Sequence, residues 1–187
     1  GMIKKTRLGD FEVSRYNRAM MAMAVKEDDV LISVVKAPSP NDVIMVTKQG
    51  YLLKFSDEEI AITGLKAMGV KGIAIGKDDQ LIKVVLANAN DELLLLTQRG
   101  NIKKLKVKDI ALSSRNKKGS LGIKAIKSNP HYFVDCIKVE SNQEVYIKTE
   151  TTQVKLNLSL FKAVDLNSVG TNIVDDAVMK LMIDEIE

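Results

Sequence analysis

The chain has 187 residues, of which 45% are hydrophobic, and its formal net charge is +4. No apolar run approaches the roughly 20 residues of a membrane-spanning helix, and no apolar signal segment follows the Lys-rich start, so we expect a soluble, cytoplasmic protein. A single cysteine and a single histidine argue against an internal disulfide, a zinc site and Cys-His or Ser-His-Asp catalysis.

A repeat of about 50 residues runs through the chain. Its clearest copies are residues 43–50 and 93–100, where Thr47 and Thr97 stand 50 positions apart, as do the glycines that end the two copies. Residues 1–5 match the end of a copy whose first strand is absent, which indicates a fragment of a longer protein. Residues 26–35 also match 76–85, and a weaker copy lies over 145–156. A period of this size is typical of a repeat architecture.

Each repeat reads as a set of short strands. An apolar run such as residues 93–96 predicts a strand buried on both faces. Gly50 and Gly100 predict hairpin turns with positive φ, followed by return strands at 51–55 and 101–105. A polar loop, a Gly-rich stretch, a third strand, an Asp-Asp turn and a fourth strand complete the unit.

Four strands in about 50 residues is the size of a propeller-like blade, and such sheets must stack to bury a core. We therefore predict one all-β domain over residues 1–187, with the last unit ending in an acidic segment. The predicted blades are residues 1–41 (partial or strand-exchanged), 42–91, 92–143 and 144–187.

Two side-chain groups invite a functional interpretation, but local structure explains them. The pairs Asp28-Asp29 and Asp78-Asp79 lie at the turn between strands in both copies, so we interpret them as turn residues and predict no metal site. The methionine-rich run over residues 20–23 is interpreted as blade-core packing.

Charge is distributed unevenly along the chain. Residues 99–127 contain ten lysines and arginines against Asp109 alone, whereas residues 157–187 carry six acidic residues against Lys162 and Lys180. This asymmetry favours a polyanionic partner for the basic module.

Several linked motifs occur in one order: Thr47-Lys48-Gln49-Gly50, Lys54, residues 69–73 (Gly-Val-Lys-Gly-Ile) and Asp78-Asp79. They resemble the C-terminal domain of the GyrA/ParC-type subunit of bacterial type II topoisomerases, a family that contains topoisomerase IV and DNA gyrase. The resemblance covers almost the whole chain. It implies a β-pinwheel, a propeller-like disc of four-stranded blades that exchange strands and whose outer rim binds and bends DNA.

Within this family the chain is more similar to the topoisomerase IV type. The Gln-Arg-Arg-Gly-Gly-Lys-Gly box of gyrase is absent, and residues 2–18 look like the Gram-positive topoisomerase IV protein. A gyrase domain remains the close alternative, and a propeller-like protein-interaction scaffold is the alternative from another class.

The resemblance implies a non-catalytic domain that presents the transported duplex during ATP-dependent strand passage, decatenation and supercoil relaxation. It implies double-stranded DNA, an ATPase subunit of the ParE type and a second ParC-type subunit as partners, a nucleoid-associated location, and no cofactor in this fragment. Tyr16 follows Arg15 as the family's nucleophilic tyrosine follows an arginine, but it lacks that motif's other neighbours, so we predict no catalytic residue.

Binding of this kind depends on phosphate contacts made by cations along one edge. The alternative interpretation is that exposed lysines only keep the surface soluble. The predicted DNA-binding residues are Lys4, Lys5, Arg7, Arg15, Arg18, Lys54, Lys66, Lys71, Arg99, Lys103, Lys104, Lys106, Arg115, Lys117, Lys118 and Lys124.

Overall fold

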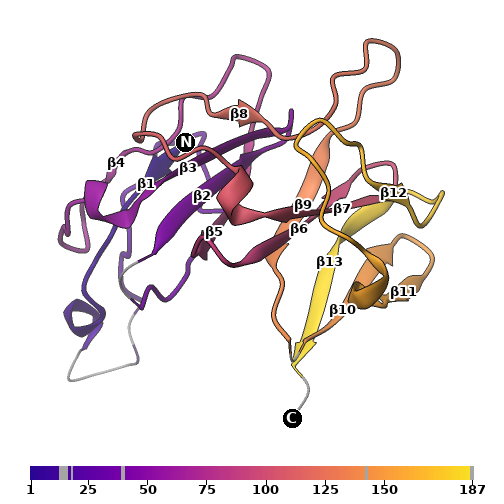
Figure 1. The fold of residues 1–187 in the computed structure, drawn as a ribbon. Coiled ribbons are helices and arrows are strands. Elements are labelled where there is room, and N and C mark those ends of the chain that lie inside the picture. The colour runs from indigo at the N-terminus through magenta and orange to yellow at the C-terminus, as the bar shows by residue number, and fades with distance from the viewer. Residues whose placement is uncertain (13–16, 18, 39–40, 142, 186–187) are drawn as a thin grey trace.

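The computed structural model describes residues 1–12, 17, 19–38, 41–141 and 143–185. Its strands form sheets that follow one another across the molecule in chain order (Figure 1). The first sheet has two strands, β1 (Met2–Ile3) and β4 (Val70–Lys71). The predicted all-β class is confirmed.

The next two sheets have four antiparallel strands each, and the last has three. The second sheet has the order β5-β2-β3-β8, from β2 (Asp42–Thr47), β3 (Tyr51–Ser56), β5 (Leu81–Ala87) and β8 (Ser120–Leu121). The third has the order β12-β7-β6-β9, from β6 (Glu92–Thr97), β7 (Asn101–Lys106), β9 (Phe133–Lys138) and β12 (Thr171–Asn172). The fourth has the order β11-β10-β13, from β10 (Gln143–Thr149), β11 (Gln153–Leu156) and β13 (Val178–Glu185).

A short 3-10 helix follows the return strand of each unit. These helices are η1 (Leu8–Phe11), η2 (Asp57–Glu59), η3 (Val107–Asp109) and η4 (Leu158–Leu160). Within the described residues, no helix combines the length and the apolarity that crossing a bilayer requires.

The two clearest repeats form the predicted hairpins. Residues 43–46 and 93–96 are buried, and Gly50 and Gly100 have φ values of 97° and 71°. In each hairpin the residue before Thr47 or Thr97 pairs with the second residue after the glycine. The side chain of that threonine also accepts a hydrogen bond from the residue after the glycine, which closes the turn.

Successive units exchange strands. The Gly-rich stretch of each later unit supplies a two-residue strand to the return strand of the unit before: β4 to β1, β8 to β3 and β12 to β7. Gly119 makes the close approach possible, because it has φ 83° and a Cβ there would lie 2.4 Å from the carbonyl oxygen of Leu52. This exchange is the feature that the family resemblance implies for a β-pinwheel, whereas the blade boundaries drawn from the sequence stay a prediction.

Hydrophobic clusters lie between neighbouring sheets. One contains Met45 and Phe55 with Ile3 and Val70 packed against them, and thus joins the first two sheets. A second joins the next pair through residues that include Ile44 and Leu95, and a third joins the last pair. Because alternate residues of β2 face different clusters, the whole apolar run is buried.

The first unit departs from the prediction in two places. Residues 30–35, which match the strand β5, form no strand, and their apolar side chains from Val30 to Val35 are exposed. Met20 and Met21 are exposed as well, so the interpretation of this run as blade core was wrong for these two. The physical reason is the same in both cases, since no described strand pairs with these segments to cover them.

Candidate nucleic-acid interface

Two of the predicted DNA-binding lysines point into the protein. Lys54 and Lys103 are 6% and 1% exposed. Lys54 Nζ donates to the carbonyl of Val107 at 2.9 Å. Lys103 Nζ donates to three carbonyls, those of Gly122, Leu166 and Ser168, at 2.7, 2.5 and 2.9 Å. Burial lowers the pKa of Lys103 to about 8, and the nearby Asp165 opposes this shift. We correct the prediction by removing both lysines from the interface, because their ammonium groups already have protein partners.

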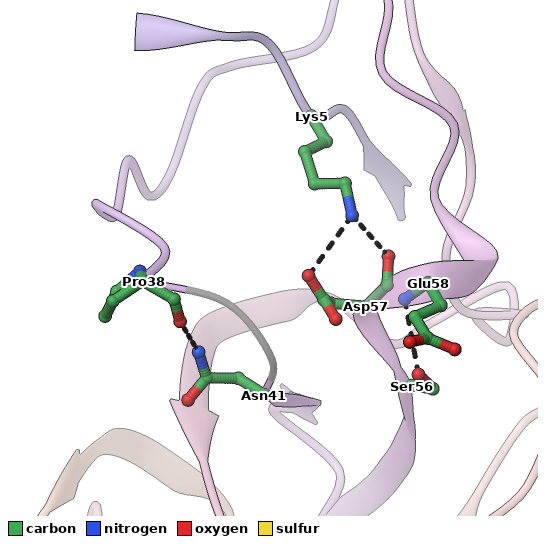
Figure 2. A network of polar contacts seen from close by, with 6 residues as sticks. All are labelled: Lys5, Pro38, Asn41, Ser56, Asp57 and Glu58. Atoms are coloured by element: carbon green, nitrogen blue, oxygen red, sulfur yellow. Dashed lines mark hydrogen bonds and ion pairs between the residues drawn. The ribbon is translucent and has the colours of Figure 1, made fainter.

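Three more return-strand lysines are partly buried and partnered. Figure 2 shows Lys5 reaching Asp57, where Nζ lies 2.9 Å from the carbonyl and 3.1 Å from the carboxylate. Lys104 pairs with Glu92 at 2.8 Å. Lys4 donates to the carbonyls of Ala22 and Leu65, both at 2.6 Å, and burial lowers its pKa while Asp10 opposes the shift.

These lysines share a structural role. Lys5 and Lys54 each reach the carbonyl of the first residue of the 3-10 helix in the next unit, Asp57 or Val107. Lys5, Lys54 and Lys104 also form parallel bridges to matching residues of the next unit, namely Ile62, Leu112 and Ala163. The return-strand cations therefore connect units, and their recurrence in the sequence reflects this structural contact.

The other predicted cations lie toward the surface. Exposed side chains belong to Arg7, Lys66, Lys71, Arg99, Lys106, Lys117, Lys118 and Lys124, and Arg115 is half-buried. Arg99 has protein partners, because its Nη1 lies 3.2 Å from the Asn129 carbonyl and 3.3 Å from His131 Nε2. Burial and this arginine lower the pKa of His131. The predictions at Arg15, Tyr16 and Arg18 lie outside the described residues.

Four of these cations gather where the second and third sheets exchange a strand, and we name Lys71, Arg115, Lys117 and Lys118 the junction cluster. Arg115 Nη1 donates to the Lys71 carbonyl at 3.0 Å. Lys117 bridges Ile73, two residues from Lys71, and its carbonyl accepts from Ala74 at 2.9 Å. Lys118 comes just before the exchanged strand β8. Residues more than 40 positions apart in sequence are therefore placed side by side.

Two features of the junction were missed in the sequence. Lys118 Nζ lies 4.0 Å from the centre of the Tyr51 ring, an aromatic contact that belongs to the preceding unit. Glu59 Oε2 accepts from the backbone of Arg115 at 3.0 Å, so one carboxylate borders the cluster. Tyr51 directly follows the turn glycine, but only strand exchange brings Lys118 to it. Lys108 and Lys127, which lie in the basic module, are also exposed.

The junction cluster has the chemistry of an anion-binding surface. None of the five ion pairs in the described part of the chain involves its four cations. Exposed lysines and an arginine suit phosphate oxygens and give no base discrimination by themselves. No cluster of three potential metal ligands occurs among the described residues. Asp79 accepts from the backbone of Gln49 and Gln80, both at 2.8 Å, which confirms its predicted role in a turn.

Comparison with protein families gives one match over most of the chain. The family described as DNA gyrase C-terminal domain, beta-propeller, matches residues 1–38, 41–88 and 91–140. The ParC-type subunit of DNA topoisomerase 4 from Bacillus subtilis (strain 168) is 40% identical over 73 residues, which are 39% of this chain and 9% of that protein. The corresponding protein of Staphylococcus epidermidis is 41% identical over the same shares. The chain thus spans about a tenth of the length of these relatives.

Solved structures agree on the fold. A crystal structure of the C-terminal domain of DNA topoisomerase IV superposes with a TM-score of 0.92 at 27% identity, covering 99% of this chain and 59% of that one. A DNA gyrase A C-terminal domain gives a TM-score of 0.74 at 19% identity, covering 88% of this chain and 57% of the other. The second likeness shows the fold alone.

Proposed function

This chain belongs to the DNA gyrase C-terminal domain family, and from that premise we propose that it is a non-catalytic domain that binds and bends duplex DNA. We assign it to the ParC-type subunit of a topoisomerase IV. The higher TM-score against a topoisomerase IV domain and the absence of the gyrase box support this assignment over gyrase.

In the longer protein, the domain would hold the duplex that is transported during ATP-dependent strand passage, and so act in decatenation and supercoil relaxation. A second ParC-type subunit and a ParE-type ATPase subunit would be its partners, and the nucleoid its location. The names of the relatives support the topoisomerase context. The fragment itself would have no enzymatic activity and no cofactor.

The junction cluster carries the DNA-binding proposal. It places four cations from two units on one edge, bordered by the carboxylate of Glu59. Smooth bending of a short duplex costs on the order of 1 to 6 kcal/mol, so several phosphate contacts must form together to offset it. The exposed Arg7, Lys66, Lys106 and Lys124 are the further candidates for such contacts.

The test is fluorescence anisotropy with a random-sequence duplex across a salt titration. We expect log affinity to fall linearly with log salt, by about 0.9 per phosphate contacted. The double variant Lys117→Gln, Lys118→Gln should weaken binding several-fold and flatten this slope by about 1 to 2.

The matched control is Lys162→Gln with Lys180→Gln in the last unit, because both lysines are exposed and the same charge is removed. It should change affinity less than the junction variant does. Equal effects from the two double variants would contradict a localised interface. No binding at low salt would contradict DNA binding by this fragment and favour the protein-interaction scaffold.

A further inference from the structure

The first unit contains an exposed apolar segment whose counterpart in the second unit is covered. Leu31, Ile32, Val34 and Val35 match Leu81, Ile82, Val84 and Val85 at a spacing of 50 residues. Val35 is 50% exposed, whereas Val85 is 7% exposed. The difference arises because β5 pairs with β2, where Val85 faces Ile44 and Val84 faces Met45.

The return strand of the first unit is also paired on one side only. In the following units, β3 lies between β2 and β8, and β7 lies between β6 and β12. Among the described residues, β1 pairs with β4 alone. The matching central strand, equivalent to β2 and β6, is the one element of the pattern that the first unit does not show.

The turn that receives such a strand is already formed. Asp79 accepts from its following residue, Gln80, and from Gln49, which leads directly into Gly50. Asp29 stands at the matching position and accepts in the same way from Val30 at 2.9 Å. Asp29 also acts on the Gly1 amino group, raising its pKa against the lowering effect of burial. Gly1 in turn matches Gly50, because its carbonyl accepts from Gly72 at 2.9 Å as that of Gly50 accepts from Gly122 at 2.7 Å.

We propose that the first unit binds one further strand between β1 and residues 30–36: an extended segment with four consecutive apolar residues that runs directly into Gly1. The segment would make the contacts that β2 makes before Gly50 and β6 makes before Gly100. An apolar strand fits because side chains alternate between the two faces of a sheet and both faces are covered in the later units. Backbone hydrogen bonds on both sides would supply the pairing, as in β-strand addition.

The test joins a copy of residues 42–49 directly to Gly1. In the matched control extension, the four residues copied from Val43 to Val46 are serines. We expect the apolar extension to raise Tm by more than about 4 °C, since it would bury several apolar side chains. It should also slow amide exchange of residues 31–36 at least roughly tenfold, because those amides would join a sheet. The serine extension should do neither.

A second variant tests the site without depending on how well the extension behaves. Val35→Ser in the extended chain should remove much of the gain in Tm, whereas it should change the unextended chain little, because Val35 is half exposed there. Equal exchange rates at residues 31–36 with the apolar and serine extensions would overturn the proposal. So would a gain in Tm that Val35→Ser leaves unchanged.

Discussion

At the scale of single residues, lysines at one repeated position have different structural roles. Lys4 and Lys103 occupy matching places in the first and third units, and each donates to a carbonyl of its own unit and to the loop of the next. In the second unit the matching residue is Leu53, which lies in a hydrophobic cluster. A buried ammonium must be hydrogen-bonded to be tolerated, and three carbonyls provide this for Lys103.

Replacing Lys103 should therefore destabilise the fold and leave the DNA interface in place. Lys103→Leu fills much of the space, as Leu53 does in the second unit, but three carbonyls lose their donor. We expect a loss of about 1 to 3 kcal/mol in the free energy of unfolding. Lys103→Ala should lose more, because a cavity is added.

Urea denaturation measures both variants, and DNA affinity under native conditions is the second readout. Affinity reduced as strongly as by the junction variant, with unfolding unchanged, would instead place Lys103 at the DNA.

The pKa of Lys103 predicts a pH dependence of stability. In the unfolded chain the lysine titrates near 10.5, whereas in the folded protein it titrates at about 8. Between these values the unfolded state binds more protons, so the free energy of unfolding should rise with pH over this range. One pKa unit corresponds to about 1.4 kcal/mol.

The measurement is the free energy of unfolding from pH 7 to 10.5 for the natural chain and for Lys103→Met. Other groups titrate equally in both proteins, so the difference between the two curves isolates the lysine. That difference should shift in favour of the natural chain as pH rises from 8. A constant difference would mean that Lys103 keeps its ordinary pKa.

At the scale of elements, glycines mark the junctions where strands are exchanged. Gly69, Gly119 and Gly170 have positive φ, and a Cβ on any of them would lie 2.2 to 2.4 Å from a carbonyl oxygen of the accepting strand. Neither the backbone nor that oxygen can move without breaking the pairing. The exchange thus depends on one atom's width at each junction.

Gly119→Ala should consequently destabilise the protein by more than about 2 kcal/mol, through strain at positive φ and the clash with the Leu52 carbonyl. Gly76→Ala is the matched control, because no atom lies within 4 Å of the added Cβ and its φ is not positive. Thermal unfolding of the two variants is the measurement. A Gly119→Ala protein as stable as the Gly76→Ala protein would show that the strand at residues 120–121 contributes little.

Elements were predictable from the sequence where the pattern is local. The buried runs before Gly50 and Gly100, their turns and their return strands depend on hydrophobicity and on the glycine that permits positive φ. Strand exchange cannot be read from such a pattern, because Ser120 and Leu121 pair with a strand some 70 residues away. For the same reason residues 30–35 were predicted as a strand but form none, since pattern alone does not guarantee a partner.

The candidate site shows the same limit at the level of side chains. Its location in the basic module was predictable from charge density over residues 99–127. Which lysines are free was not, because Lys103 and Lys117 look alike in sequence and differ only in the carbonyls that tertiary structure brings to them.

At the scale of the whole molecule, the exchange links each unit to the next but does not continue beyond these contacts. Residue 19 matches Gly69 and Gly119 in the repeat, but it is an alanine, whose Cβ would meet the carbonyl of an accepting strand. At the other end, Thr152 stands where Gly50 and Gly100 make room for the following unit. A Cβ at Gly100 would lie 1.9 Å from the carbonyl oxygen of Val174.

The two ends are therefore unsuited to exchange strands with each other or between copies of the chain. Head-to-tail exchange would otherwise produce rings or filaments. We expect the molecular mass in sedimentation equilibrium to be that of one chain and to stay constant with concentration. The chain extended with residues 42–49 is the control, because filling the proposed site in the first unit removes the exposed apolar segment as a cause of association. Association that persists in the extended chain, and that Thr152→Gly strengthens, would contradict this prediction and show that Ala19 can be accommodated against an accepting strand.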